Sequence, residues 1–157
     1  MKSLFRIAFP SLLALVVLAP VAMADQPGAH PHYLHALSDL RDARANLQKR
    51  GGDGAMKWDE SKAIGDVDGA IGKIKAASID DGKNLDDHPA VDAPDRSGRL
   101  HKALADLQAA KDNVNREEDN AFAQGLKGRA MHDIDSAIMR TREGLCNSGD
   151  KSFCPHG

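Results

Sequence analysis

Hydrophobic residues recur every three or four positions in four segments of the chain. In the first segment, residues 33–48, the hydrophobic stripe consists of Tyr33, Leu37, Leu40, Ala43 and Leu47. This spacing is typical of an amphipathic α-helix. Pro31 fits the first turn of such a helix, and Gly51 and Gly52 are expected to end it.

Three further stripes predict helices at about residues 59–78, 98–116 and 120–145. Their members are Ile64, Val67, Ile71 and Ile74; Leu100, Leu104, Leu107 and Val114; and Phe122, Leu126, Met131, Ile134, Ile138 and Leu145. No window keeps the period-two alternation of a strand for long enough to predict one. The pattern therefore predicts an all-α domain.

The two halves of the chain repeat each other at an offset of 67 residues. "ALSDL" at 36–40 matches "ALADL" at 103–107, and "AIGDVDGAI" at 63–71 matches "AMHDIDSAI" at 130–138. A single helical hairpin cannot bury its hydrophobic stripe alone. We therefore expect two hairpins, residues 33–78 and 99–145, to pack as a four-helix bundle within residues 25–145. The simplest connectivity for them is up-down-up-down.

The repeat also places an aspartate of each half, Asp66 and Asp133, at the margin of its stripe. One interpretation is a symmetric pair of carboxylate sites within the bundle. The alternative is a solvated flank in which the carboxylates pair with Lys62 and Arg129 at i−4. We favour the flank, because the Glu-x-x-His motif of di-iron bundles is absent.

The first 24 residues have the pattern of a secretory signal peptide. A positively charged start is followed by the apolar run "SLLALVVLAPVA" and by the small-x-small sequence Ala22-Met23-Ala24. A membrane anchor is the alternative, but the apolar run is shorter than the roughly 20 residues that span a bilayer. We expect a periplasmic or secreted protein that begins at Asp25 and is not embedded in a membrane.

The charge of the mature chain argues against nucleic acid as a partner. Of the 21 basic residues, Lys2 and Arg6 lie in the signal peptide, which leaves 19 against 23 acidic residues, a formal charge of −4. Phosphate-backbone binding usually requires a basic surface or stripe. The expected partner is therefore an unidentified protein or small ligand.

Both cysteines, Cys146 and Cys154, lie in the C-terminal tail, residues 146–157. In an oxidising compartment such a pair is most simply a disulfide. A redox-active or metal-binding pair is the alternative, but the spacing C-x7-C matches neither a C-x-x-C motif nor a zinc knuckle. The chain also lacks the C-x-x-C-H motif of covalent haem.

An acidic linker, residues 79–98, separates the predicted hairpins and has no helical periodicity. With up-down-up-down connectivity, this linker and most of the histidines belong to one end of the bundle. The candidate metal ligands there are His32, His35, His88, His101, Asp81 and Asp87. Imidazole combined with carboxylate favours a divalent transition metal such as zinc. The alternative is a soluble connector whose aspartates dock at positively polarised helix N-termini.

The segments "HPHYLHALSDLRDAR" and "DDGKNLDDHP" resemble uncharacterised small exported bacterial helical proteins. The resemblance implies export and the helical repeat, but it implies no binding or catalytic residues. Two functions are compatible with the sequence. We expect an exported, non-enzymatic binding or structural module, and the alternative is a periplasmic metal-binding protein for storage, buffering or sensing.

Overall fold

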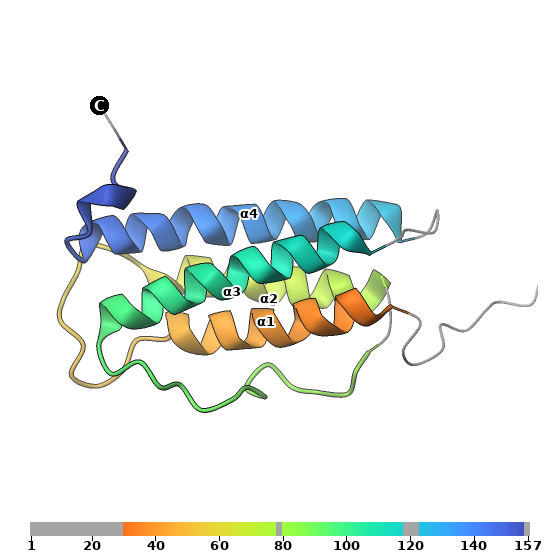
Figure 1. Ribbon diagram of the computed structural model, residues 1–157, viewed down its shortest axis with the longest axis horizontal. Coiled ribbons are helices and arrows are strands. Elements are labelled where there is room, and N and C mark those ends of the chain that lie inside the picture. Colours follow the sequence, from red (N-terminus) through yellow and green to blue (C-terminus); the bar gives the residue numbers. More distant parts are fainter. Residues whose placement is uncertain (1–29, 78–79, 118–122, 156–157) are drawn as a thin grey trace, which may run out of the picture.

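The computed structural model describes residues 30–77, 80–117 and 123–155 (Figure 1), so the predicted signal peptide lies outside the described residues. Its elements are α1 (Pro31–Leu47), α2 (Glu60–Ala77), α3 (Arg96–Arg116), α4 (Gln124–Asn147) and the short 3₁₀ helix η1 (Lys151–Phe153). No strand occurs among these residues, and the four long helices pack as a bundle, which confirms the predicted fold class. None of the described helices combines the length and the hydrophobicity needed to cross a membrane.

Hydrophobic stripes form the core as the sequence predicts. Leu40 of α1 and Leu107 of α3 are fully buried, and so are Val67 of α2 and Ile134 of α4. Ile64, Leu126 and Met131 pack against this core as partly buried residues, whereas Phe122 lies outside the described residues. The packing is most extensive between α1 and α3 and between α2 and α4, so each helix has its main partner in the other half of the chain.

Helices α1 and α3 run antiparallel, which contradicts the predicted up-down-up-down connectivity. Glu117, directly after α3, accepts hydrogen bonds from the backbone N–H groups of His32 (2.9 Å) and Tyr33 (3.3 Å) at the start of α1. The end of α3 therefore lies beside the beginning of α1. The order is up-down-down-up, as in bundles with one long crossover connection.

The crossover, which we define as residues 80–95, runs back along the bundle beside α1 before α3 begins (Figure 1). An extended chain covers about 3.3 Å per residue and a helix about 1.5 Å per residue, so this segment is long enough to follow a whole helix. Asp95 ends the crossover as the N-cap of α3, where its side chain accepts from the Gly98 N–H at 2.7 Å.

Polar contacts between α1 and α3 repeat at the offset of 67. Asn46 Nδ2 donates to Asp106 Oδ2 at 3.3 Å, and Asn113 Nδ2 donates to Asp39 Oδ2 at 2.8 Å. Adding 67 to the numbers of Asp39 and Asn46 gives those of Asp106 and Asn113 with the roles exchanged. This reciprocity is what a twofold relation between the halves requires.

Helices α2 and α4 show the same reciprocity with ion pairs. Arg140 Nε donates to Asp66 Oδ2 at 2.7 Å, and Lys73 Nζ makes the equivalent contact with Asp133. Two interpretations of Asp66 and Asp133 were given from the sequence, a pair of carboxylate sites and pairing with Lys62 and Arg129 of the same helix. Both were wrong. The carboxylates form no shared site, and they pair with cations of the facing helix because the bundle brings the stripe margins of α2 and α4 together.

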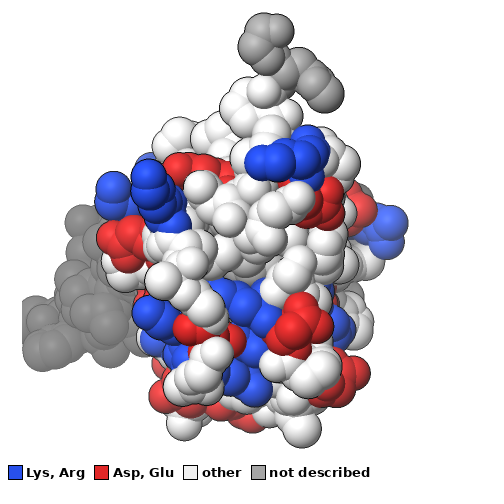
Figure 2. Space-filling view, turned by 90° about the vertical axis from the view of Figure 1, so that its left-hand side faces the viewer, with Lys and Arg blue, Asp and Glu red and all other residues white. Residues whose placement is uncertain are grey.

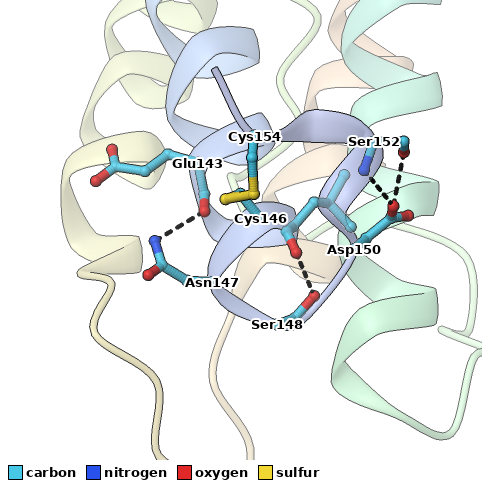
Figure 3. Close-up of a disulfide and its surroundings, with 8 residues drawn as sticks. Glu143, Cys146, Asn147, Ser148, Asp150, Ser152 and Cys154 are labelled. Carbon is cyan, nitrogen blue, oxygen red and sulfur yellow. Dashed lines mark hydrogen bonds between the residues drawn. A yellow bond between two sulfur atoms is a disulfide. The ribbon is translucent and has the colours of Figure 1, made fainter. Parts of the chain in front are cut away.

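A disulfide joins Cys146, near the end of α4, to Cys154, as predicted (Figure 3). Between them, the Asp150 carboxylate accepts from the N–H and the hydroxyl of Ser152 and so begins η1. Asp150 also lies 3.2 Å from Nε2 of His101, which connects the tail to α3. The crosslink therefore organises the chain beyond α4 and not the bundle.

Candidate functional site

The first part of the crossover is fixed to α1 by a buried arginine. Arg41 is 1% exposed, and its guanidinium donates to Asp81 Oδ1 at 2.8 Å and to the Asn84 carbonyl at 2.9 Å. Burial alone would raise the pKa of Asp81, but hydrogen bonds from Arg41 and Lys75 hold that pKa below its usual value. The Asp81 carboxylate is therefore occupied by cations of the protein itself.

A second buried arginine fixes the other end of the crossover. Arg99 of α3 is 1% exposed, donates to Asp53 Oδ1 at 2.7 Å, and donates to the Pro94 carbonyl at 3.1 Å. It thereby joins the α1–α2 connection to the crossover. Figure 2 shows this end of the bundle, where basic and acidic side chains lie interspersed.

The six candidate metal ligands do not share one end of the bundle, so that prediction was wrong. His32 and His35 lie at the start of α1, whereas His101 lies at the start of α3, at the opposite end (Figure 1). The antiparallel order of α1 and α3 separates them. Asp87 has a different neighbour, Lys83, with Nζ 3.9 Å from Oδ2. Within the ranges the structure describes, no group of three or more histidine, cysteine or acidic residues could hold a metal ion.

A different constellation forms where the middle of the crossover passes over α1 and α3. It surrounds a cavity of about 180 Å³, which we call the crossover cavity. Its walls are Asp42 and Asn46 of α1, Lys102 of α3, and His88, Pro89, Ala90, Val91 and Asp92 of the crossover. Of the six predicted ligands, His88 alone lines this cavity. The crossover thus contributes to a site, but at the side of the bundle and not at its end.

Two residues that line the cavity, Asp42 and Asn46, each have a side-chain oxygen that is buried beneath the cavity surface and lacks a donor. Asn46 is 4% exposed, and its Nδ2 donates to the Asp42 carbonyl at 2.9 Å and to Asp106 Oδ2 at 3.3 Å. No donor among the described residues reaches Oδ1 of Asn46 or Oδ1 of Asp42, although both atoms are buried. Buried acceptors without a donor are rare and costly, because burial removes their bonds to water.

The carboxyl groups around this wall are partly buried, and burial disfavours their charged form. Burial raises the pKa of Asp42 and of Asp106, although Lys102 opposes the rise in both. Burial also raises the pKa of Asp39, against an opposing hydrogen bond from Asn113. The aspartates repel one another as well, which adds to the rise at Asp42 and Asp106. On this side of the α1–α3 pair, burial therefore disfavours the charged form of three carboxyl groups.

The part of this site that α1 and α3 contribute was not predicted from the sequence. Asp39, Asp42 and Asp106 were not among the predicted site residues. Each lies beside a hydrophobic stripe, where polar residues are usual. A signal was nevertheless present, since Asn46 and Asp39 recur in the second half as Asn113 and Asp106. Polar residues kept at equivalent positions of a repeat indicate a contact between its copies.

No family model matches the chain, and neither a curated protein nor a solved structure is significantly similar to it. The resemblance to small exported helical proteins stays a prediction. The function is therefore inferred from the geometry and electrostatics of the crossover cavity.

Proposed function

We propose that the mature chain is an exported, non-enzymatic helical-bundle module that binds a small ligand in the crossover cavity. The observation that carries this proposal is the cavity of about 180 Å³ itself, which is lined by Asp42, Asn46 and Lys102 of the helices and by His88 and Asp92 of the crossover. Binding sites combine a largely preformed cavity with a few fixed polar groups. The crossover cavity has both features.

The attachment of the crossover supports a preformed site. Arg41 and Arg99, both buried, hold its two ends, and Arg44 Nη1 donates to Asp86 Oδ1 between them at 2.9 Å. The opposite wall is supplied by helices, which are the most rigid elements of the fold. A cavity fixed in this way binds with little loss of conformational entropy.

The alternative, a periplasmic metal-binding protein, has less support. His88, Asp42 and Asp92 all line the cavity, and they are the residue types that zinc accepts. They do not, however, form a group that could hold a metal ion in the described part of the chain. Zinc is therefore a competitor to be included in the binding experiments.

Fragment screening by two-dimensional NMR tests the proposed site. Small polar fragments should shift the amide signals of Asn46, Val91 and Lys102 together, because these residues surround one cavity. Ala90→Trp should abolish these shifts by filling the cavity. Ala105→Trp, at an exposed position of α3, is the matched control and should leave them unchanged. Fragments that bind Ala90→Trp as well as they bind the native chain would show that the cavity is not the site.

Export has its own test. Intact-mass measurement of protein from the cell envelope or the medium should show a chain that begins at Asp25, because signal peptidase cleaves after small residues. A full-length cytoplasmic product would contradict both the predicted signal peptide and the predicted periplasmic or secreted location. The disulfide supports export, since such bonds are common in oxidising compartments.

A further inference from the structure

We propose that a groove on the outer face of α4 is the contact surface of a homodimer, with a second copy of this chain as its occupant. The groove, which we call the tail groove, has a volume of about 480 Å³ and is lined by Met139, Arg142, Glu143, Cys146, Phe153 and Pro155. It lies on α4 and the C-terminal tail, whereas the crossover cavity lies between the crossover, α1 and α3. Dimerisation therefore goes beyond the proposed binding function.

The tail groove presents hydrophobic surface that the bundle itself does not cover. Four of its six lining residues are apolar. Met139 is 65% exposed, whereas Leu34, the other exposed large hydrophobic residue of the described ranges, is 36% exposed. Phe153 packs against the hydrophobic core from the tail. Covering Met139 beside an aromatic ring removes apolar surface from water and allows a favourable contact between sulfur and the ring.

The groove is preformed, because the tail that supplies one of its walls is fixed to the bundle. The disulfide between Cys146 and Cys154 ties the tail to α4 (Figure 3). The ring of Phe153 meets the ring of His101 edge-on, with centroids 5.5 Å apart, which also holds the tail to α3. A surface fixed in this way loses little conformational entropy when a partner binds.

Two charged residues flank the hydrophobic line of the groove with opposite signs. An α-helix turns by about 100° per residue, so Cys146 lies nearly in line with Met139 along α4. By the same rule, Arg142 lies on one side of this line and Glu143 on the other. Neither side chain forms an ion pair with another residue in the described part of the chain. Both charges are therefore available to a partner.

This pattern is complementary to itself. Homodimers usually have a twofold axis, so that any contact between two different residues occurs twice. If the axis runs parallel to α4, the Arg142 side of each copy faces the Glu143 side of the other at nearly the same height. The two Met139 side chains then meet at the axis, between two equivalent ion pairs. Parallel coiled coils combine a hydrophobic seam with flanking charges in the same way.

The contact is confined to the last part of α4 and the tail. One turn before Met139, the same face carries Asp135, whose carboxylate pairs with Lys111 of α3. The two α4 helices should therefore diverge towards their beginnings. Small interfaces are typical of transient complexes. We expect monomer and dimer to be in equilibrium.

Sedimentation velocity of the mature chain tests the dimer. The weight-average sedimentation coefficient should rise with protein concentration from the monomer value towards the dimer value. Met139→Asp should keep the chain monomeric, because it removes the hydrophobic contact and brings two like charges together at the axis. Leu34→Asp on α1 is the matched control and should leave the equilibrium unchanged. A native chain that stays monomeric at its highest soluble concentration would overturn the proposal.

Charge reversal tests the symmetric pairing. Arg142→Glu and Glu143→Arg each turn two attractive contacts into two repulsive ones, and each should raise the dissociation constant of the dimer about tenfold or more. The double variant Arg142→Glu/Glu143→Arg restores both pairs with exchanged signs and should recover the native constant. Arg129→Glu, exposed on the same helix outside the groove, should change nothing. A double variant that dimerises as weakly as the single ones would show that the proposed twofold contact is wrong.

Two further outcomes separate dimerisation from other functions. Reduction of the disulfide should weaken the dimer, because it releases a wall of the groove, and an unaffected dimer would mean that the groove is not the interface. If a fatty acid binds in the groove while the chain stays monomeric, the groove takes a small ligand and the dimer proposal fails. Fragment binding in the crossover cavity of a strictly monomeric chain would refute the dimer alone, and dimerisation without fragment binding would refute the proposed function alone.

Discussion

The α2–α4 and α1–α3 pairs are built on the same repeat, yet they balance charge differently. Between α2 and α4, the two repeat-related aspartates each face a cation of the other helix, with Asp66 bonded to Arg140 and Asp133 to Lys73. A Cβ on Gly69 would lie only 2.7 Å from Asp133 Oδ2, so glycine leaves room for this pair. These two aspartates of the α2–α4 interface are therefore neutralised by cations of the facing helix.

The α1–α3 pair has asparagine where the α2–α4 pair has lysine or arginine. Asn46 and Asn113 donate to Asp106 and Asp39, but an amide carries no charge to offset a carboxylate. The crossover covers this pair and adds to the burial of its acidic groups. The excess negative charge therefore lies beside the crossover, which has no counterpart in the repeat.

The largest expected effect tests whether the two halves are equivalent in energy. Leu40→Ala and Leu107→Ala remove fully buried side chains at positions 67 apart. Each should lower the free energy of unfolding by about 2–5 kcal/mol, and the two losses should be similar. Denaturant melts measure both. If either substitution leaves the free energy of unfolding unchanged, that residue is not part of the core. The two halves would then not be equivalent.

The next effect concerns the crossover, which the buried Arg41 of α1 holds through Asp81 and Asn84. Lys75 of α2 also pairs with Asp81. Arg41→Met removes the bonds to Asp81 and Asn84 and should cost about 1.5–3 kcal/mol. Hydrogen exchange should become faster in residues 80–92 and stay unchanged in α2 and α4. Uniformly faster exchange would mean that the crossover and the bundle open as one unit.

Replacing one aspartate in each helix pair by asparagine should change the free energy of unfolding in opposite directions. At pH 7, Asp133→Asn should destabilise by about 0.5–1 kcal/mol, because it breaks a partly exposed ion pair with Lys73. Asp106→Asn should stabilise by about 0.5 kcal/mol, because it removes a charge that burial disfavours and that neighbouring carboxylates repel.

The pH dependence of this contrast follows from the raised pKa of Asp106. The folded state holds the Asp106 proton more tightly than the unfolded state does, so ionisation of Asp106 weakens the fold at neutral pH and protonation restores the loss as pH falls. The gain from Asp106→Asn should therefore disappear in acid. Thermal melts between pH 7 and pH 4 measure it, and a gain that persists at pH 4 would contradict the electrostatic cause.

The smallest effect is expected from reducing the disulfide. The bond between Cys146 and Cys154 encloses only the tail beyond the bundle, so neither helix pair depends on it. Circular dichroism should show nearly unchanged helix content after reduction. A large loss of helix would mean that the tail supports α4 more than its contacts indicate.

Most of the fold could be predicted from the sequence, because the residues of the hydrophobic stripes are the ones that become buried. The buried residues of α1 and α3 occupy the expected positions, and the disulfide follows from two cysteines in one tail. Helix direction could not be predicted in this way, since a hydrophobic stripe has no polarity along its axis. The histidines were misplaced for that reason, and His88 reached the site because the crossover runs along α1.

The pairing of α1 with α3 and of α2 with α4 also has a consequence for folding kinetics. The most extensive packing joins helices from different halves of the chain, so neither hairpin can bury its stripe before the other arrives. The entropy of closing the long crossover must be lost before these contacts form. Among helical bundles of this size, the protein should therefore fold slowly, because its stabilising contacts are distant in sequence.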